Sequence, residues 1–260
     1  NIKASSDGIE VEEGFLIVNK GDFELNVVDD ALVASYEEGD PAIDPYLIIN
    51  GGTFVINTTE GEGIESKSTV TINAGTIVAK TVDDAINAGT AIYINGGKIF
   101  AQSTGNDAID SNGVIGISGG ITIAIGSRDP EGGFDADRSN FSITGGLVLG
   151  LGGTTSSPTA STSDLYSVVA DGGIANQIIH IETTTGEDIL TFLAPTSNNT
   201  LLFASEKLKA GTSYSLYLGG SVTDGSHSNG LYESGTYTKG TLSKTFTPSA
   251  KITQIGGRIF

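Results

Sequence analysis

One short phrase recurs along the first 150 residues and limits what this chain can fold into. It reads as one or two small or acidic residues, then Ala or Gly, then an apolar residue, and often a second acid. The copies are Asp7-Gly8-Ile9-Glu10, Asp30-Ala31-Leu32-Val33, Glu62-Gly63-Ile64-Glu65, Asp84-Ala85-Ile86-Asn87 and Asp107-Ala108-Ile109-Asp110, with a divergent copy at Gly133-Phe134-Asp135. Their apolar residues lie 23, 32, 22, 23 and 25 positions apart. A period in this range indicates a solenoid, in which each repeat buries its apolar face only by stacking on its neighbours.

Gly-rich turns follow each phrase about half a repeat later and separate short runs of alternating apolar and polar residues. One example is Ile92-Tyr93-Ile94-Asn95, which leads through Gly96-Gly97 into Lys98-Ile99-Phe100-Ala101. Alternation with period two places every second side chain inward, and the Gly pairs permit a corner between two strands. No helical pattern separates these runs. We therefore predict an all-β fold, a parallel β-helix of about five to six coils.

The repeat defines three regions of the chain. We expect residues 1–153 to form the parallel β-helix, with extra loops at Ser35–Pro45 and Ser127–Gly133. Residues 154–164 are rich in Gly, Ser and Thr and predict a linker or long loop. Residues 165–260 lose the repeat but keep strand patterns, which predicts a β-rich C-terminal region packed on the solenoid or capping it.

The charge of the chain excludes several classes of partner. The net charge is −18, and residues 1–153 hold 23 acids against 7 bases. A nucleic acid partner would need Lys and Arg to neutralise phosphates, and an anionic membrane surface is disfavoured for the same reason. No apolar run approaches the length of a membrane span. We expect no nucleic acid partner, no membrane insertion, and a cation as partner instead.

The chain contains neither Cys nor Met. The sequence has no Cys, so it can form neither a disulfide nor a thiolate metal site, and it has no Met. We therefore expect a processed or truncated chain whose signal or anchor segment is not in this sequence. The expected location is secreted or cell-surface, and the expected state is a monomer.

Stacking of the coils would align the acids of successive phrases. Asp30, Glu62, Asp84 and Asp107 would form one column, and a second column would contain Glu10, Glu65, Asn87, Asp110 and Asp135. Unit charges ~4–5 Å apart repel by several kcal/mol at an effective dielectric constant of about 20. No Lys or Arg falls within the phrase, so we expect protonation or a hard cation to compensate. Ca²⁺ suits carboxylate and amide oxygens, whereas Zn²⁺ prefers His or Cys. The alternative is a solvated acidic edge that discourages aggregation.

The phrases also resemble a known family. The residues that carry this likeness are Glu62-Gly63-Ile64-Glu65, Asp83-Asp84-Ala85-Ile86-Asn87, Asn106-Asp107-Ala108-Ile109-Asp110-Ser111-Asn112-Gly113 and Leu208-Lys209-Ala210-Gly211-Thr212-Ser213-Tyr214. They resemble bacterial calcium-containing, right-handed parallel β-helix proteins that bind polysaccharide. That family is typified by a cellulose- and pectin-binding protein of cellulolytic clostridia, and its shape is similar to that of pectate lyases.

The resemblance implies Ca²⁺ between the coils and a plant-type polysaccharide partner, acidic and pectin-like or cellulose-like. The implied metal ligands are Glu62, Glu65, Asp83, Asp84, Asn87, Asn106, Asp107, Asp110 and Asp135. The chain departs from the family in two respects. It has no Trp, so a flat aromatic platform for cellulose is not evident. The coils around Asp30 and Val33 lack the second acid, so the resemblance does not extend to a cation there.

Catalysis is the main alternative to simple binding. A pectate lyase uses Ca²⁺ together with an Arg or Lys base, and Arg128 and Arg138 are the candidates here because they bracket a group of Asp residues. Each Arg could instead pair with a neighbouring Asp at the surface. His180 and His227 have no Ser or Cys partner at a recognisable spacing, so we expect no catalytic triad.

Binding is the function that we favour from the sequence. We expect Arg128, Arg138 and the exposed ring of Tyr217 to contact the polysaccharide. The first hypothesis is therefore a calcium-binding carbohydrate-binding protein. The second is a calcium-dependent polysaccharide lyase, and the third is a surface adhesin or structural solenoid without a sugar ligand.

Overall fold

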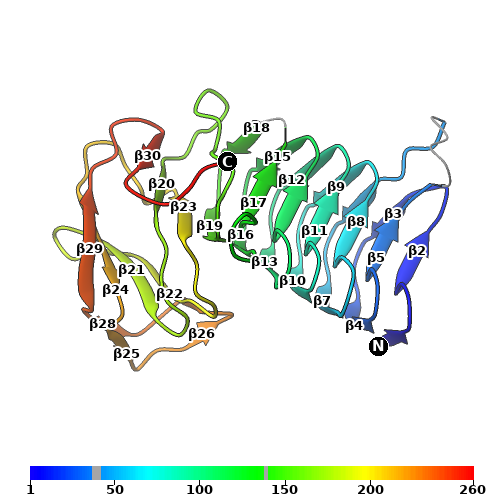
Figure 1. Cartoon of the computed structure of the whole chain (residues 1–260), viewed down its shortest axis with the longest axis horizontal. Helices are drawn as coiled ribbons and strands as arrows, with labels where there is room; N and C mark the ends of the chain where they lie inside the picture. Colours follow the sequence, from blue (N-terminus) through cyan, green and yellow to red (C-terminus); the bar gives the residue numbers. More distant parts are fainter. Residues whose placement is uncertain (37–41, 138–139) are drawn as a thin grey trace.

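The computed structural model describes residues 1–36, 42–137 and 140–260. Arg138 and the middle of the expected loop Ser35–Pro45 lie outside the described residues. The described part contains strands and no helix. Six coils of three strands each, followed by the first strand of a seventh, stack along one axis, and Figure 1 shows the N-terminus at the far end of this stack from the C-terminal region. The predicted parallel β-helix is confirmed.

Each coil contributes one strand to each of three parallel sheets. Sheet 1 of the solenoid contains β1 (Ile2–Ala4), β4 (Asp22–Val27), β7 (Thr53–Thr58), β10 (Thr76–Thr81), β13 (Lys98–Ser103), β16 (Ile121–Ile125) and β19 (Leu147–Gly152). Sheet 2 contains β2 (Ile9–Val11), β5 (Leu32–Ala34), β8 (Ile64–Ser66), β11 (Ile86–Ala88), β14 (Ile109–Ser111) and β17 (Phe134–Ala136). Sheet 3 contains β3 (Leu16–Val18), β6 (Leu47–Ile49), β9 (Thr69–Ile72), β12 (Ala91–Ile94), β15 (Val114–Ile117) and β18 (Asn140–Ile143).

The apolar residue of the repeated phrase forms a continuous inner column. In sheet 2, Ile64 pairs with Ile86, Ile86 with Ile109, and Ile109 with Phe134. All four side chains have no exposed surface. Because a one-residue slip would turn this column outward, burial of the phrase fixes the register of every coil.

The corner between sheets 3 and 1 is built from Asn and Gly. Asn73 donates its side-chain amide to Oδ1 of Asn50 at 2.7 Å, and Asn95 donates to Oδ1 of Asn73 at 2.8 Å. The last Gly of each turn has a positive φ, and at Gly120 φ is +78°. A Cβ there would lie 2.4 Å from the carbonyl oxygen of Gly97. The stacked turns therefore require Gly both for its conformation and for its size.

The C-terminal region adds three strands to sheet 1, and the first of them beyond β19 runs antiparallel to the solenoid strands. β23 (Thr200–Ser205) pairs antiparallel with β19, and β20 (Ser167–Asp171) and β30 (Ile252–Gln254) extend the same sheet. Sheet 4 contains β26 (His227–Ser228), β27 (Leu231–Tyr232), β22 (Asp188–Leu193), β21 (Ile178–Thr183), β24 (Tyr214–Leu218) and β29 (Thr241–Phe246). A two-stranded ribbon joins β25 (Ser221–Thr223) to β28 (Thr236–Thr238).

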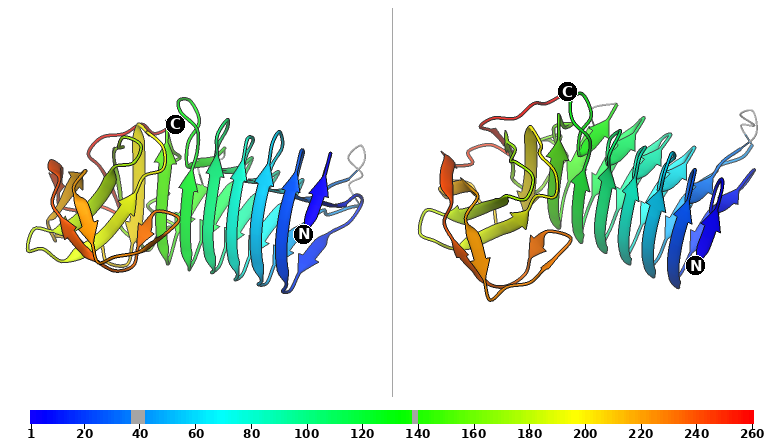
Figure 2. Two further views of the ribbon diagram at one scale, coloured as in Figure 1. Left: turned by 90° about the horizontal axis from the view of Figure 1, so that it is seen from below. Right: turned by 60° about the horizontal axis from the view of Figure 1, so that its bottom comes forward.

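A second core joins the two regions. Phe100 and Leu149 point from the outer face of sheet 1 into a buried cluster that includes Ile181, Leu190 and Phe192 of sheet 4. The C-terminal region thus both extends the last coil and covers part of one face of the solenoid (Figure 2). Burial of this apolar face is the main force that holds the two regions together.

Residues 154–164 run along the last coil. The amide of Ser156 donates to the carbonyl oxygen of Phe134 at 2.8 Å, and the amide of Leu165 donates to that of Ile143 at 3.2 Å. These contacts satisfy backbone groups at the exposed edges of sheets 2 and 3. In the described part of the chain, no helix is long and apolar enough to cross a membrane.

Candidate functional site

The acids of the repeat lie in register on sheet 2, as the spacing predicts. Glu65 pairs with Asn87, Asn87 with Asp110, and Asp110 with Asp135, so these residues form one column across β8, β11, β14 and β17. The other column lies two residues before these strands. There the amide of Gly63 donates to the carbonyl oxygen of Asp84 at 3.0 Å. We call the two columns together the acid ladder.

Several acids of the ladder are buried. Asp84 is 3% exposed, and Asp107 and Glu65 are each 5% exposed. The stacking of the coils removes these three side chains from solvent. The alternative of a fully solvated acidic edge does not agree with this burial. Buried carboxylates require a partner or a proton.

Part of that compensation comes from the backbone of the next coil. Oδ1 of Asp7 accepts the amide of Asp30 at 3.1 Å, and Oδ1 of Asp30 accepts the amide of Glu62 at 2.7 Å. Oδ1 of Asp107 accepts the amide of Gly132 in the same way. Asp7, Asp30 and Asp107 therefore have a structural role, because each fixes the backbone just before a strand of the following coil.

Asp84 differs because one of its carboxylate oxygens accepts no hydrogen bond within the described residues. Its Oδ2 accepts the side-chain amide of Asn87 at 2.9 Å. Its Oδ1 is buried and has no hydrogen-bond partner among residues 1–36, 42–137 and 140–260. Within those residues, Asp84, Asp107 and Asp110 also form no ion pair. An orphaned carboxylate oxygen beside other acids is what a site for a hard cation requires.

The titration of these acids reflects their crowding. Burial, followed by the charges of Asp110 and Asp83, raises the pKa of Asp84 to about 7. Burial and the charge of Asp135 raise the pKa of Asp110 to about 7. For Asp107, burial raises the pKa to about 8 although the Gly132 amide opposes the shift. Burial also raises the pKa of Glu62 and of Asp135.

Three further predicted ligands, Glu65, Asp83 and Asn106, have partners within the protein. Lys67 forms an ion pair with Glu65, so this acid is compensated by a base just outside the repeated phrase. Burial still raises the pKa of Glu65, against the influence of Lys67. Asn106 donates its side-chain amide to Oδ1 of Asp83 at 2.7 Å. The ladder is therefore least compensated at Asp84, Asp107 and Asp110.

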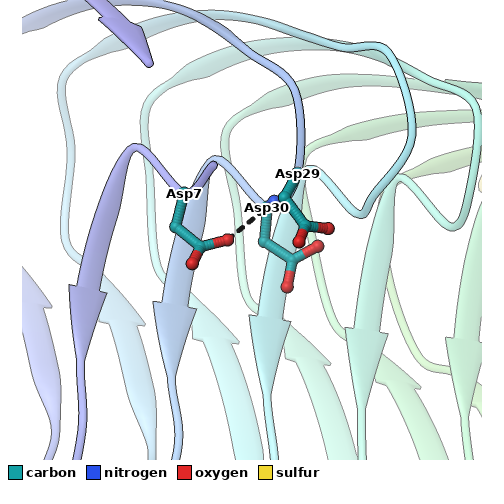
Figure 3. Close-up of side chains that lie close together, drawn as sticks. All are labelled: Asp7, Asp29 and Asp30. Carbon is teal, nitrogen blue, oxygen red and sulfur yellow. Dashed lines mark hydrogen bonds between the residues drawn. The ribbon is translucent and has the colours of Figure 1, made fainter. Parts of the chain in front are cut away.

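A tighter group of acids lies in the first two coils. Carboxylate oxygens of Asp7, Asp29 and Asp30 all lie within 4.8 Å of one another (Figure 3). Burial, with the neighbouring Glu62, raises the pKa of Asp30 to about 8. The resemblance did not extend to a cation here because Val33 replaces the second acid. Sequence reasoning missed this group because its third member, Asp29, precedes the phrase, although Asp83 stands in the same position before Asp84.

Arg128 and Tyr217 are the other predicted binding residues that the structure describes. Arg128 is exposed and lines a cleft of about 410 Å³ together with Thr104 and Ser197. It forms no ion pair within the described residues, whereas the neighbouring Asp129 pairs with Arg258. Arg138 lies outside the described residues. Surface pairing of Arg128 with Asp129, which the sequence suggested, does not occur.

Tyr217 is half-buried and lies on β24 opposite His180 of β21. The ammonium of Lys239 lies 5.1 Å from the centre of its ring. His180 is 2% exposed and stacks on Tyr237, with ring centres 3.9 Å apart. The ribbon of β25 and β28 supplies Tyr237 and accounts for this burial. His180 is therefore buried between sheet 4 and this ribbon.

The donor types of the ladder suit Ca²⁺. They are carboxylate and amide oxygens, without His or Cys, and Oδ1 of Asp84 is buried with no partner among the described residues. Within those residues, carboxylate oxygens of three acids converge within 4.8 Å at Asp7, Asp29 and Asp30 and not around Asp84. Ca²⁺ accepts 6–8 oxygen ligands in irregular geometry. Fold and site together define a parallel β-helix with a buried, in-register ladder of oxygen donors.

Comparison with known proteins adds a link to carbohydrate. A family model described as carbohydrate-binding domain-containing protein matches residues 1–108. The match covers the first four coils and the first strand of the fifth, including the ladder as far as Asp107. No curated protein and no solved structure gives a significant match.

Proposed function

We propose that this protein is a secreted or cell-surface, monomeric, calcium-binding protein that binds a plant-type polysaccharide. The observation that carries the calcium part is the buried Oδ1 of Asp84, which has no partner among the described residues and lies in a ladder of other acids. The matched family model supports carbohydrate binding. The β-helix supports it as well, because a long stack of strands offers an extended surface to an extended chain.

The polysaccharide of this proposal is acidic and pectin-like or neutral and cellulose-like. An acidic chain would supply carboxylates that compete for or share Ca²⁺ with the ladder, since hard cations take carboxylate oxygens from either source. The cleft at Arg128 supports the acidic class, because a guanidinium that forms no ion pair with the described residues and lies beside hydroxyl groups suits a sugar carboxylate. The absence of Trp argues against binding on a broad aromatic platform.

Thermal unfolding in a chelator and then in millimolar Ca²⁺, with Mg²⁺ as the control, tests the calcium part. A ligand that binds only the folded state stabilises it by about 2.7 kcal/mol at a hundredfold excess over Kd. We expect a large upward shift in Tm with Ca²⁺ alone. No shift after thorough chelation would contradict the proposal. Pull-down with polygalacturonate and with cellulose, in Ca²⁺ and in chelator, then tests the glycan part.

A calcium-dependent lyase is the second candidate function, and the observation that favours it is the exposed Arg128, which forms no ion pair within residues 1–36, 42–137 and 140–260. Arg128 would act as the base that removes a proton α to the uronate carboxylate. Release of unsaturated sugars from polygalacturonate, followed by their ultraviolet absorbance, distinguishes a lyase from a binder. Absence of product at high enzyme concentration would eliminate this candidate. If the protein bound no glycan at all, the remaining hypothesis would be a surface adhesin or structural solenoid without a sugar ligand.

A further inference from the structure

A second cleft lies between the solenoid and the C-terminal region, away from the acid ladder. Its volume is about 390 Å³. Ile121 and Leu147 of sheet 1 form one wall, and Asp188, Tyr232 and Tyr237 are on the other. The segment around β26 and β27 returns to the outer face of sheet 1 at this point (Figure 2). The ladder lies on sheet 2, so the two sites have no residue in common.

The aromatic part of this cleft is held in place before any ligand arrives. The hydroxyl of Tyr237 donates to the carbonyl oxygen of Gly219 at 2.9 Å and accepts the amide of Gly240 at 3.0 Å. The ring also stacks on the buried His180. Tyr232 packs its ring against the edge of His227, with ring centres 5.0 Å apart. Fixed rings lose little entropy when a ligand packs on them.

The carboxylate in the cleft is also positioned. Oδ2 of Asp188 accepts the hydroxyl of Thr191 at 3.0 Å, and the same hydroxyl oxygen lies 2.9 Å from Nδ1 of His180. Because Thr191 donates its proton to Asp188, it accepts from His180. Oδ1 of Asp188 has no partner within the described part of the chain, and the side chain is exposed. This oxygen is therefore available to accept hydrogen bonds from a ligand.

The charges around the cleft limit its occupant. The charged residues that line it are Asp188, Glu233 and Lys207, and Glu233 is paired with Lys98 at 3.0 Å. With Glu233 paired, the lining offers no surplus of positive charge to an anionic ligand, and the whole chain has a net charge of −18. Neither acid belongs to a group of metal-ligating side chains in the described residues. A neutral ligand with many hydroxyl groups requires neither a positively charged lining nor a bound metal ion.

We propose that this cleft binds a neutral saccharide, with its C–H faces against Tyr232 and Tyr237 and its hydroxyl groups on Asp188 and Lys207. Sugars present apolar faces and hydroxyl rims, which match rings flanked by a carboxylate and an ammonium. The volume lies within the range of sites for small ligands, about 300–1,000 Å³. This assignment rests on the proposed carbohydrate function and locates a neutral subsite that does not depend on Ca²⁺.

Calorimetric titration of the full chain with cellohexaose, xylohexaose and mannohexaose tests the assignment. Each titration is run in chelator and in Ca²⁺, with hexagalacturonate as the anionic comparison. We expect at least one neutral hexasaccharide to bind with the same Kd in both buffers. Asp188→Asn and Tyr232→Ala should each weaken that binding about tenfold or more, since each removes a direct contact. The matched controls Asp22→Asn and Tyr93→Ala, both on the solenoid surface, should leave the Kd unchanged.

Two results would overturn the neutral subsite: none of the three neutral sugars binds, or both cleft variants bind as tightly as the parent chain with an unchanged Tm. These results differ from failure of the calcium proposal. If Ca²⁺ has no effect on Tm while a neutral sugar still requires Asp188 and Tyr232, the calcium proposal fails and the subsite stands. If Ca²⁺ stabilises the chain and only polygalacturonate binds, the subsite fails and the calcium proposal stands.

Discussion

Asn87 donates its side-chain amide to Oδ2 of Asp84 at 2.9 Å, and Oδ1 of the same carboxylate stays buried without a partner in the described chain. The two residues are three positions apart in one copy of the repeat, so the phrase itself creates this geometry. The Asn holds the carboxylate in one orientation. A single cation at Oδ1 would then satisfy a group that is otherwise costly to bury.

Replacement of Asp84 by Asn should separate the role of charge from that of shape. In chelator at pH 8 we expect Asp84→Asn to be at least as stable as the parent chain, because a buried charge is removed. In Ca²⁺ we expect the variant to gain less than the parent, by about 1–3 kcal/mol, since a ligand oxygen is lost. Tm values in both buffers measure the two effects. The exposed Asp22→Asn is the control, and a full Ca²⁺ shift in Asp84→Asn would exclude Asp84 as a ligand.

The raised pKa values predict an unusual pH dependence for the calcium-free protein. The folded-state pKa values of Asp84, Asp107 and Asp110 are about 7 to 8, above their ordinary value of 3.8. Between these values the folded state binds more protons than the unfolded state. The stabilising contribution is therefore complete below about pH 4 and is lost as the pH rises through 7 to 8.

Chemical denaturation in chelator at pH 5, 6, 7 and 8 measures this loss. We expect the free energy of unfolding to decrease toward pH 8, with a slope of up to about 1.4 kcal/mol per pH unit for each group that titrates. Saturating Ca²⁺ should flatten the profile, because the cation replaces the protons. A stability that rises steadily from pH 5 to 8 in chelator would contradict the raised pKa values.

The three acids of the first coils predict an additional bound ion. Asp29 is exposed, so Asp29→Asn should fold normally while it removes one oxygen from the group with Asp7 and Asp30. We expect the variant to bind about one Ca²⁺ fewer per chain but to keep the part of the Ca²⁺-induced Tm shift that depends on Asp84. Equilibrium dialysis with metal analysis gives the count. Equal calcium content in the parent and Asp29→Asn would show that this group binds no ion.

Local repetition is what made the solenoid predictable. Each copy of the phrase specifies its own pairing, so Ile64, Ile86 and Ile109 align without knowledge of distant residues. The C-terminal region has no such repeat. The antiparallel pairing of β19 with β23 joins segments about 50 residues apart. The sequence of neither strand indicates which other strand it pairs with.

The site was predictable to the same extent. The in-register column of Glu65, Asn87, Asp110 and Asp135 follows directly from the period. The burial of Asp84 and His180 does not, because alternation assigns a side chain to a face but does not say what covers that face. For Asp84 the cover is the adjacent coil, and for His180 it is the ribbon that carries Tyr237, more than 50 positions away. Likewise, Lys67 compensates Glu65 from just outside the phrase.

The stacked Gly turns provide a test of the solenoid itself. Gly120 and Gly186 both have a positive φ, +78° and +94°. A methyl group at Gly120 would lie 2.4 Å from the carbonyl oxygen of Gly97 in the coil below, whereas at Gly186 it would meet nothing within 4 Å. Both Ala variants bear the cost of a left-handed conformation, about 1–2 kcal/mol. Only Gly120→Ala must also push two coils apart, which adds about 1–3 kcal/mol.

Urea unfolding of both variants in saturating Ca²⁺, followed by circular dichroism, gives the comparison. We expect Gly120→Ala to be clearly less stable than Gly186→Ala. The difference between the two variants isolates contact between coils, because the conformational cost is common to both. If Gly120→Ala and Gly186→Ala lose equal stability, the turns of successive coils are not in close contact, and the ladder that depends on this stacking would lose its geometric basis.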